Sequence, residues 1–266
     1  MTILEQIVEN TRQTLPGRKA KYSRRNLEET IRGLPETRDF TAALRGTMLA
    51  FITELKKTSP SKGVLRDEFE VETLASAYER GGASAISILT EEDFFQGSLH
   101  HLQHVRKQAR VPLLRKDFIV DPYQLYEARA YGADAVLLIA RMLEACELRD
   151  LMQEAEALGL ACLVEVYEER ELDQLDFDLV RILGVNNRNL ETFAVDIGNS
   201  LRVFRHCPKH VVRVSESGLS RAAELVHLWH QGVDAVLIGE AFMRASDPGQ
   251  ALACIRKEMQ EESVLP

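Results

Sequence analysis

The chain has 266 residues, of which 45% are apolar and 6% aromatic, the composition of an ordinary soluble globular domain. It carries 33 Lys and Arg against 41 Asp and Glu, a formal net charge of −8 without a basic run, which excludes nucleic acid and anionic membranes as expected partners. The longest mid-chain apolar run, Ala135 to Ala140, is far shorter than the ~18 residues of a membrane-spanning helix. The N-terminus is acidic and amphipathic, unlike a signal peptide, so we expect a cytoplasmic protein.

Residues 1–46 are predicted to form an N-terminal helical extension, because Ile3, Leu4, Ile7 and Val8 fall on one apolar helix face that must be buried. Short apolar, β-branched runs follow, beginning near residues 48, 84, 111, 135, 160, 181, 211 and 235. The segments between them have apolar residues at helical spacing. Strands and helices are therefore expected to alternate.

A partial internal repeat supports this alternation. GGASAISIL from Gly81, GADAVLLIA from Gly132 and GVDAVLIG from Gly232 each place a helix-ending glycine shortly before an apolar strand. Eight strand–helix units predict an α/β protein that folds as a (β/α)8 TIM barrel. We expect a single domain over residues 1–266, with the N-terminal extension packed on the barrel. An open doubly wound sheet is the alternative, but neither GxGxxG nor a Walker A loop follows any strand.

Cysteine and histidine spacing predicts neither a disulfide nor a metal site. The 4 cysteines lack CxxC spacing, as expected of reduced thiols, and the clustered histidines lie in no HExxH frame or carboxylate set. No metal site is therefore expected. The residues concerned are Cys146, Cys162, Cys207, Cys254, His100, His101, His104, His206, His210, His227 and His230.

Polar residues follow most of the predicted strands. The active site of a TIM barrel is built at the carboxyl ends of its strands. A single charged residue at a strand end is usually solvated or caps a helix. Polar and charged residues at the ends of several strands, all facing one mouth of the barrel, indicate an active site. The glycines after the last two strands mark the usual phosphate position of this fold. These residues are Glu54, Lys56, Lys116, Glu165, Asn186, Arg188, Glu216, Ser217, Gly218, Gly239 and Glu240.

With these residues in place, the sequence resembles the indole-3-glycerol phosphate synthase family of tryptophan biosynthesis over nearly the whole chain. Asn189 stands where many relatives have Asp, and Glu240 where some have Ser. The segments that carry the resemblance are TELKKTSPSKG (53–63), ILTEEDFFQGS (88–98), LLRKDFIVDPYQ (113–124), LVEV (163–166), GVNNRNLETF (184–193), SESG (215–218) and LIGE (237–240).

The resemblance implies an enzyme that converts 1-(2-carboxyphenylamino)-1-deoxyribulose 5-phosphate into indole-3-glycerol phosphate, carbon dioxide and water without a cofactor. Lys116 would be the general acid that protonates the substrate carbonyl. Its pKa would have to fall, through desolvation or a neighbouring cation such as Lys56. Glu165 would be the general base for dehydration and re-aromatisation.

The remaining site residues take supporting roles by the same resemblance. Lys56 would face the substrate carboxylate and pair with Glu54. Asn186 and Glu216 would hold the substrate hydroxyl and the catalytic groups, while Arg188 would orient Glu54 or its network. The implied slot for the aromatic ring consists of Phe95, Phe118 and Leu137, and the implied phosphate cradle of Ser59, Ser217, Gly218, Gly239 and Glu240.

Other functions remain open at this stage. Another phosphate-binding barrel enzyme, either a sugar-phosphate isomerase or an aldolase with a Schiff base on Lys116, would use a similar site. A catalytically silent scaffold barrel is the alternative outside enzymes. The expected partner is a small phosphorylated substrate, and a monomer is the simplest assembly. The family resemblance also places the extension across the barrel mouth, whereas plugging the opposite end or covering a flank are the alternatives.

Overall fold

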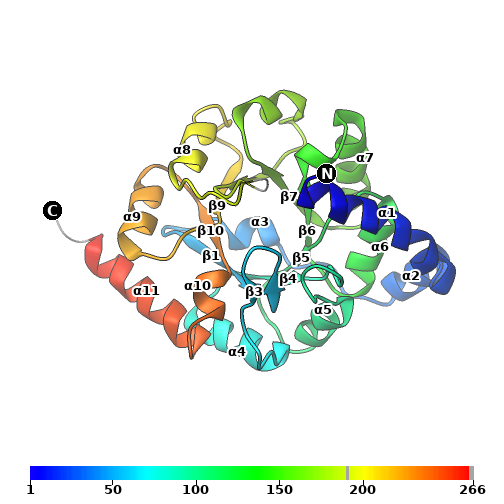
Figure 1. Cartoon of the computed structure of the whole chain (residues 1–266), viewed down its shortest axis with the longest axis horizontal. Helices are drawn as coiled ribbons and strands as arrows, with labels where there is room; N and C mark the ends of the chain where they lie inside the picture. Colours follow the sequence, from blue (N-terminus) through cyan, green and yellow to red (C-terminus); the bar gives the residue numbers. More distant parts are fainter. Residues whose placement is uncertain (190–191, 264–266) are drawn as a thin grey trace.

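The computed structural model describes residues 1–189 and 192–263 and has a closed parallel barrel at its centre (Figure 1). The strand order around the barrel is β1-β10-β9-β8-β7-β6-β5-β4, so that neighbours in sequence are neighbours in space. The predicted TIM barrel is confirmed, and the open sheet is wrong. The strands are β1 (Ala50–Leu55), β4 (Ala85–Leu89), β5 (Leu113–Lys116), β6 (Ala135–Ile139), β7 (Ala161–Val166), β8 (Ile182–Asn186), β9 (Val212–Glu216) and β10 (Ala235–Ile238).

The strands are apolar almost throughout because both of their faces are covered. Side chains alternate along a strand, so that Ala50 and Ile52 of β1 fill the barrel interior while Phe51 and Leu55 pack outward against the helices. Two separate cores result. Polar residues at inward positions are therefore restricted to the open end of the barrel.

Helices surround the barrel as the sequence pattern predicts, although a 3-10 segment, η2, stands between β7 and β8. Gly82, Gly132 and Gly232 take positive φ angles of 94°, 94° and 81° just before strands, a conformation that favours glycine. No helix in the described residues is long and apolar enough to cross a membrane. The elements are α4 (Val71–Gly81), α5 (Leu99–Arg106), α6 (Pro122–Ala130), η1 (Ala140–Met142), α7 (Ala145–Ala157), η2 (Glu169–Gln174), α8 (Gly198–Phe204), α9 (Ala222–His230), α10 (Glu240–Met243) and α11 (Pro248–Glu262).

The N-terminal extension forms α1 (Ile3–Lys21), α2 (Arg24–Arg32) and α3 (Phe40–Ala43), which cover two ends of the barrel. Ile3, Leu4 and Ile7 of α1 line the cavity at the barrel mouth, as expected. Phe40 and Leu44, in and just after α3, instead join the interior core at the opposite end. In Figure 1, α1 and α2 run along the side of α6 and α7, and α3 lies behind the strands. The extension thus serves both as cover and as plug.

A short antiparallel hairpin follows β1, and the sequence analysis does not predict it. It consists of β2 (Thr58–Ser59) and β3 (Gly63–Val64). Gly63 has a positive φ of 66°. The hairpin lies in front of the barrel in Figure 1 and brings Ser59 to the mouth.

Candidate active site

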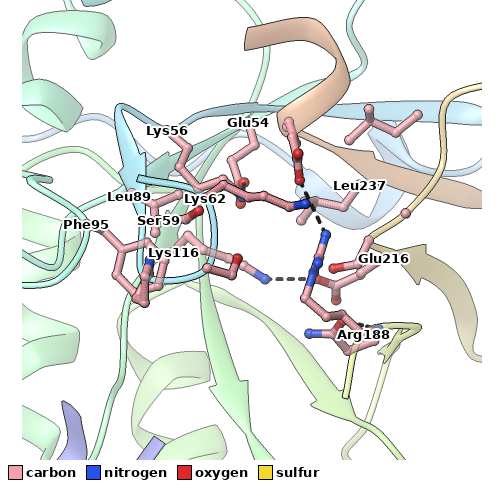
Figure 2. A pocket seen from close by; sticks show the side chains of 18 of the residues that line it. Glu54, Lys56, Ser59, Lys62, Leu89, Phe95, Lys116, Arg188, Glu216 and Leu237 are labelled. Carbon is pink, nitrogen blue, oxygen red and sulfur yellow. Dashed lines mark hydrogen bonds and ion pairs between the residues drawn. The ribbon is translucent and has the colours of Figure 1, made fainter. Parts of the chain in front are cut away.

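A cavity of about 540 Å³ opens at the carboxyl ends of the barrel strands. Every site residue predicted from the sequence lines it. Figure 2 shows that the side chains converge on this space from different strands. The predicted residues are Glu54, Lys56, Ser59, Phe95, Lys116, Phe118, Leu137, Glu165, Asn186, Arg188, Glu216, Ser217, Gly218, Gly239 and Glu240.

Strand periodicity explains why the charged groups meet. Lys116 lies two residues after Leu114, and Glu165 two after Leu163, and both leucines belong to the interior core. Side chains two apart share a face of the strand, so the charged residues continue the interior rows upward into the cavity. Glu54 and Glu216 follow the same rule on β1 and β9.

Lys116 stands between two carboxylates. Its Nζ donates to Oε2 of Glu165 at 3.0 Å and to Oε2 of Glu216 at 2.8 Å. Asn186 donates through Nδ2 to Oε1 of Glu165 at 3.3 Å, so that carboxylate is held from two sides. The other oxygen of Glu216, Oε1, is buried and has no hydrogen-bond partner within the described part of the chain. The Lys116 ammonium, which can donate a proton, therefore lies within hydrogen-bond distance of the Glu165 carboxylate, which can accept one.

The electrostatics of Lys116 differ from the sequence prediction. Burial lowers the pKa of Lys116, but the nearby carboxylates of Glu165, Glu216 and Glu54 raise it more, so that the net pKa lies above its ordinary value. The predicted fall in the pKa of Lys116 is wrong, because these three carboxylates outweigh burial. Burial, opposed by Lys116 and reinforced by Glu165, raises the pKa of Glu216 to about 8.

Glu54 and Lys56 form the ion pair that the sequence predicts, with Nζ 2.6 Å from Oε1. Burial raises the pKa of Glu54, whereas Lys56 and Lys116 lower it, and the net pKa falls below its ordinary value. Glu54 is therefore ionised at neutral pH. It holds the Lys56 ammonium at the cavity wall, where an incoming anion can reach it.

Among the described residues, Arg188 forms no hydrogen bond or ion pair with Glu54, so the predicted contact with Glu54 itself is wrong, whereas its backbone N–H donates to Oδ1 of Asn186 at 3.0 Å. The Nη2 of Arg188 lies 3.3 Å from Oε2 of Glu240, whose other oxygen lies 3.3 Å from Nε of Arg244. Arg188 stands two residues past the end of β8 and reaches across the mouth to α10, not down into the barrel. The Glu240 carboxylate therefore binds two arginines at the rim.

Two glycines make room for the buried carboxylates. A Cβ on Gly184 would collide with Oε1 of Glu216, and a Cβ on Gly239 would collide with Oε1 of Glu54. The sequence analysis assigns no role to Gly184. A glycine inside a strand is a signal of such close approach and could have identified it.

The aromatic slot lies on the β4 and β5 side. The rings of Phe95 and Phe118 are 5.9 Å apart, and Leu89 and Ile139 join Leu137 in the apolar wall. An anthranilate-sized ring would meet aromatic and aliphatic surface there.

Glu91 holds the loop that carries Phe95. Its buried carboxylate accepts hydrogen bonds from the backbone N–H groups of Asp93, Phe94 and Phe95 at 3.1, 2.7 and 3.0 Å. The backbone also folds back on itself, with Gly97 N–H donating to the Glu91 carbonyl at 2.7 Å. The aromatic ring is thus fixed by hydrogen bonds beneath it.

The opposite rim consists of backbone and cations. Ser217 and Gly218 take positive φ angles of 71° and 79°, and a Cβ on Gly218 would collide with Val195. Lys62 and Arg244 also line the cavity, although the sequence analysis does not name them. The predicted segment 184–193 includes Leu190 and Glu191, which lie outside the described residues.

No group of His, Cys, Asp and Glu residues in the described chain is arranged to hold a metal ion. Cys146 and Cys254 are exposed, whereas Cys162 is half-buried and Cys207 buried. All four cysteines carry free thiols.

Comparison with known proteins identifies the family. The family model described as indole-3-glycerol phosphate synthase matches residues 4–255. The chain belongs to the indole-3-glycerol phosphate synthase family. The indole-3-glycerol phosphate synthase of Salinibacter ruber is 51% identical over 97% of this chain and 96% of that protein. The indole-3-glycerol phosphate synthase of Rhodopirellula baltica is 44% identical over 93% of this chain and 96% of that protein.

Solved structures of lower identity show the same fold. A thiamine phosphate pyrophosphorylase from Pyrococcus furiosus superposes with a TM-score of 0.58 at 17% identity, covering 82% of this synthase family member and 98% of that chain. A mutant tryptophan synthase alpha-subunit from the same organism gives 0.57 at 14% identity over 81% and 98%. At these identities the likeness supports the TIM barrel alone.

Proposed function

We propose that the cavity at the barrel mouth closes the indole ring of 1-(2-carboxyphenylamino)-1-deoxy-D-ribulose 5-phosphate, releasing carbon dioxide and water. As a member of the indole-3-glycerol phosphate synthase family, the chain is a carboxy-lyase. The observation that carries the assignment of roles is the placement of Lys116 between Glu165 and Glu216 beside an aromatic slot.

Lys116 acts as the general acid of ring closure. Its raised pKa keeps it protonated at neutral pH, so it meets the substrate as an ammonium. As the carboxylate-bearing ring carbon bonds to the ribulose carbonyl carbon, the carbonyl oxygen becomes basic and takes the proton from Nζ. Carbon dioxide then leaves from that ring carbon. A positioned acid of this kind contributes roughly 10² to 10⁴ in rate.

Glu165 acts as the general base of the following dehydration. The Glu165 carboxylate takes the proton that the neighbouring carbon loses as the new ring becomes aromatic and passes it to the departing hydroxyl, which leaves as water. Asn186 holds this carboxylate by its hydrogen bond at 3.3 Å and supports its orientation toward the cavity. Glu216 shares the Lys116 ammonium and keeps the acid directed into the site.

Cations at the rim suit a substrate with a carboxylate and a phosphate. Lys56 would receive the carboxylate, and the amides around Gly218 and Gly239 would receive the phosphate near Ser59. Lys62 adds positive charge at the same rim. These local charges attract an anion although the whole chain carries −8.

The test is to add the synthetic ribulotide phosphate to the purified chain in chelator and to follow indole fluorescence. Because the proposal assigns every proton transfer to side chains, turnover is expected without metal or nucleotide. Activity that is lost in chelator and restored by a metal would contradict it. Borohydride trapping separates the aldolase, since a covalent adduct on Lys116 would indicate a Schiff base.

A further inference from the structure

The strand end that carries Lys116 is weakly supported by the sheet. Between β5 and β6 the only register pairs are Leu114 with Ala135 and Arg115 with Val136, whereas β6 and β7 form five pairs. Lys116 lies beyond the last pair on that side. On the β4 side, its carbonyl accepts from Thr90 N–H at 3.1 Å. The ladder between β5 and β6 therefore ends before Lys116.

Buried side chains of β5 and its neighbours supply the missing support. Arg115 is 0% exposed and faces away from the cavity. Its guanidinium donates to Asp117 Oδ2 at 2.7 Å, to Thr90 Oγ1 at 3.0 Å and to the Gln124 carbonyl at 2.6 Å. Asp117 in turn accepts from the backbone N–H of Phe118 at 2.8 Å. The residues on either side of Lys116 are thus held to each other, to Thr90 in the loop after β4 and to Gln124 of α6.

This clamp is connected to the N-terminal extension by charge. Two guanidinium nitrogens of Arg115 lie 3.4 Å from Oε2 of Glu127 on α6. The Glu127 carboxylate also accepts hydrogen bonds from Nε and Nη2 of Arg18 on α1, and the distance from Nε to Oε1 is 3.0 Å. Arg18, Arg115, Asp117 and Glu127 therefore carry two positive and two negative charges, which balance. We call these four residues the β5 relay.

Balance matters because the relay is largely buried. A buried charge that loses its partner is strongly destabilising, since nothing replaces its lost hydration. Without Arg18, Glu127 would be left with Arg115 as its cation, and would draw that guanidinium away from Asp117 and Thr90. The backbone on both sides of Lys116 would then lose its clamp.

We propose that Arg18 of the N-terminal extension is a positioning residue for the general acid, acting through Glu127 and Arg115 to fix Lys116 and Phe118. The inference rests on the proposed function, because it assigns Lys116 its role. Helix α1 then does more than cover the mouth. It also completes the charge balance that holds the acid.

The decisive variants are Arg18→Met, Glu127→Gln and the double variant, assayed with the ribulotide phosphate well below each melting temperature. Arg18→Met should lower kcat about tenfold, the scale of a coupling within one charge network. Adding Glu127→Gln should restore kcat to within about threefold of wild type, because it removes the excess negative charge. Arg18→Lys should restore part of the loss, since it returns the charge without the two-pronged contact.

Lys19→Met is the matched control. Lys19 is the next residue of α1, is 43% exposed in its side chain against 31% for Arg18, and pairs with Asp121 of the α6 cap at 2.7 Å. This variant should keep kcat within about twofold of wild type, as surface pairs contribute little.

Either of two results would overturn the inference. Arg18→Met could match Lys19→Met in kcat, or the double variant could be impaired by the sum of its single effects, which a merely structural role predicts. Absence of turnover in wild type itself would instead contradict the proposed function, so the two failures are distinguishable.

Discussion

The two sides of the barrel mouth are built by different means. The acid side, at the ends of β4 and β5, is held by buried carboxylates and a guanidinium that bind backbone groups, as Glu91, Arg115 and Asp117 do. The side that we propose binds the phosphate, here called the phosphate side, lies at the ends of β8, β9 and β10 and consists of glycines and strained backbone with partly exposed side chains. Phe193 and Val195, beside Gly218, are 38% and 42% exposed.

This difference fits the roles that we propose for the two sides. A proton transfer and a ring closure depend on side-chain positions within fractions of an ångström, so rigid support is needed. A phosphate dianion is recognised by its charge and by several amides at once, which tolerates a looser frame. Changes on the acid side should therefore lower kcat, and changes on the phosphate side should alter KM.

The largest expected effect on the acid side comes from Lys116→Ala. It should lower kcat by at least ~10², because it removes the general acid, while the barrel remains folded. Glu165→Gln should behave similarly. Steady-state kinetics with circular dichroism as the folding control provide the check. A near-normal kcat with a raised KM in either variant would show that the assigned role is wrong.

Gly184→Ala should be next in size. The new methyl group would push Glu216 away from Lys116, and a displacement of this scale can lower kcat by roughly 10 to 10². Gly17→Ala is the control, because a Cβ on that glycine meets nothing within 4 Å. Equal kcat values for the two variants would indicate that the position of Glu216 does not matter.

Glu91→Gln should loosen the ring slot. One amide oxygen cannot replace a carboxylate that accepts three backbone N–H groups, so Phe95 should lose its fixed position. We expect KM to rise about threefold to tenfold, the effect of a lost buried hydrogen bond or two. Glu92→Gln, on the adjacent exposed residue, should leave KM unchanged. The acid-side model fails if both variants behave alike.

On the phosphate side, Glu240→Ser should improve binding modestly. It removes a carboxylate from the rim and releases Arg188 and Arg244 toward the ligand. KM, and the inhibition constant of inorganic phosphate, should fall about twofold to fivefold with kcat unchanged, as expected of a partly exposed charge. Glu258→Ser on α11 serves as a control. A lowered kcat would break the proposed division between the two sides.

The smallest effect concerns stability against pH. The pKa of Glu216 is raised from 4.5 to about 8, so the folded state binds this proton more tightly than the unfolded state does. Its contribution to the free energy of unfolding is fully present below about pH 4.5 and is lost as the pH rises through about 8. Denaturant unfolding of wild type and Glu216→Gln across this window should show wild type losing stability relative to the variant. A constant difference would contradict the raised pKa.

Local patterns in the sequence predict much of this protein. Short continuous apolar runs and glycine-ended helices indicate the barrel, because strand composition, side-chain alternation along a strand and positive φ are properties of single segments. The same alternation places Lys116 and Glu165 on interior rows. The family segments then identify the residues that line the cavity, since each carries its own motif.

Tertiary structure decided what depends on which segments become neighbours. Lys116 meets Glu165 and Glu216 from 49 and 100 residues away, and its pKa is a sum over those distant charges, so its direction could not be read from the nearby Lys56. Arg188 likewise pairs with Glu240, 52 residues further along the chain, and not with Glu54. Sequence patterns and motifs report on residues that are close along the chain. Electrostatic and packing interactions depend on distances in space, which are set only when the barrel closes.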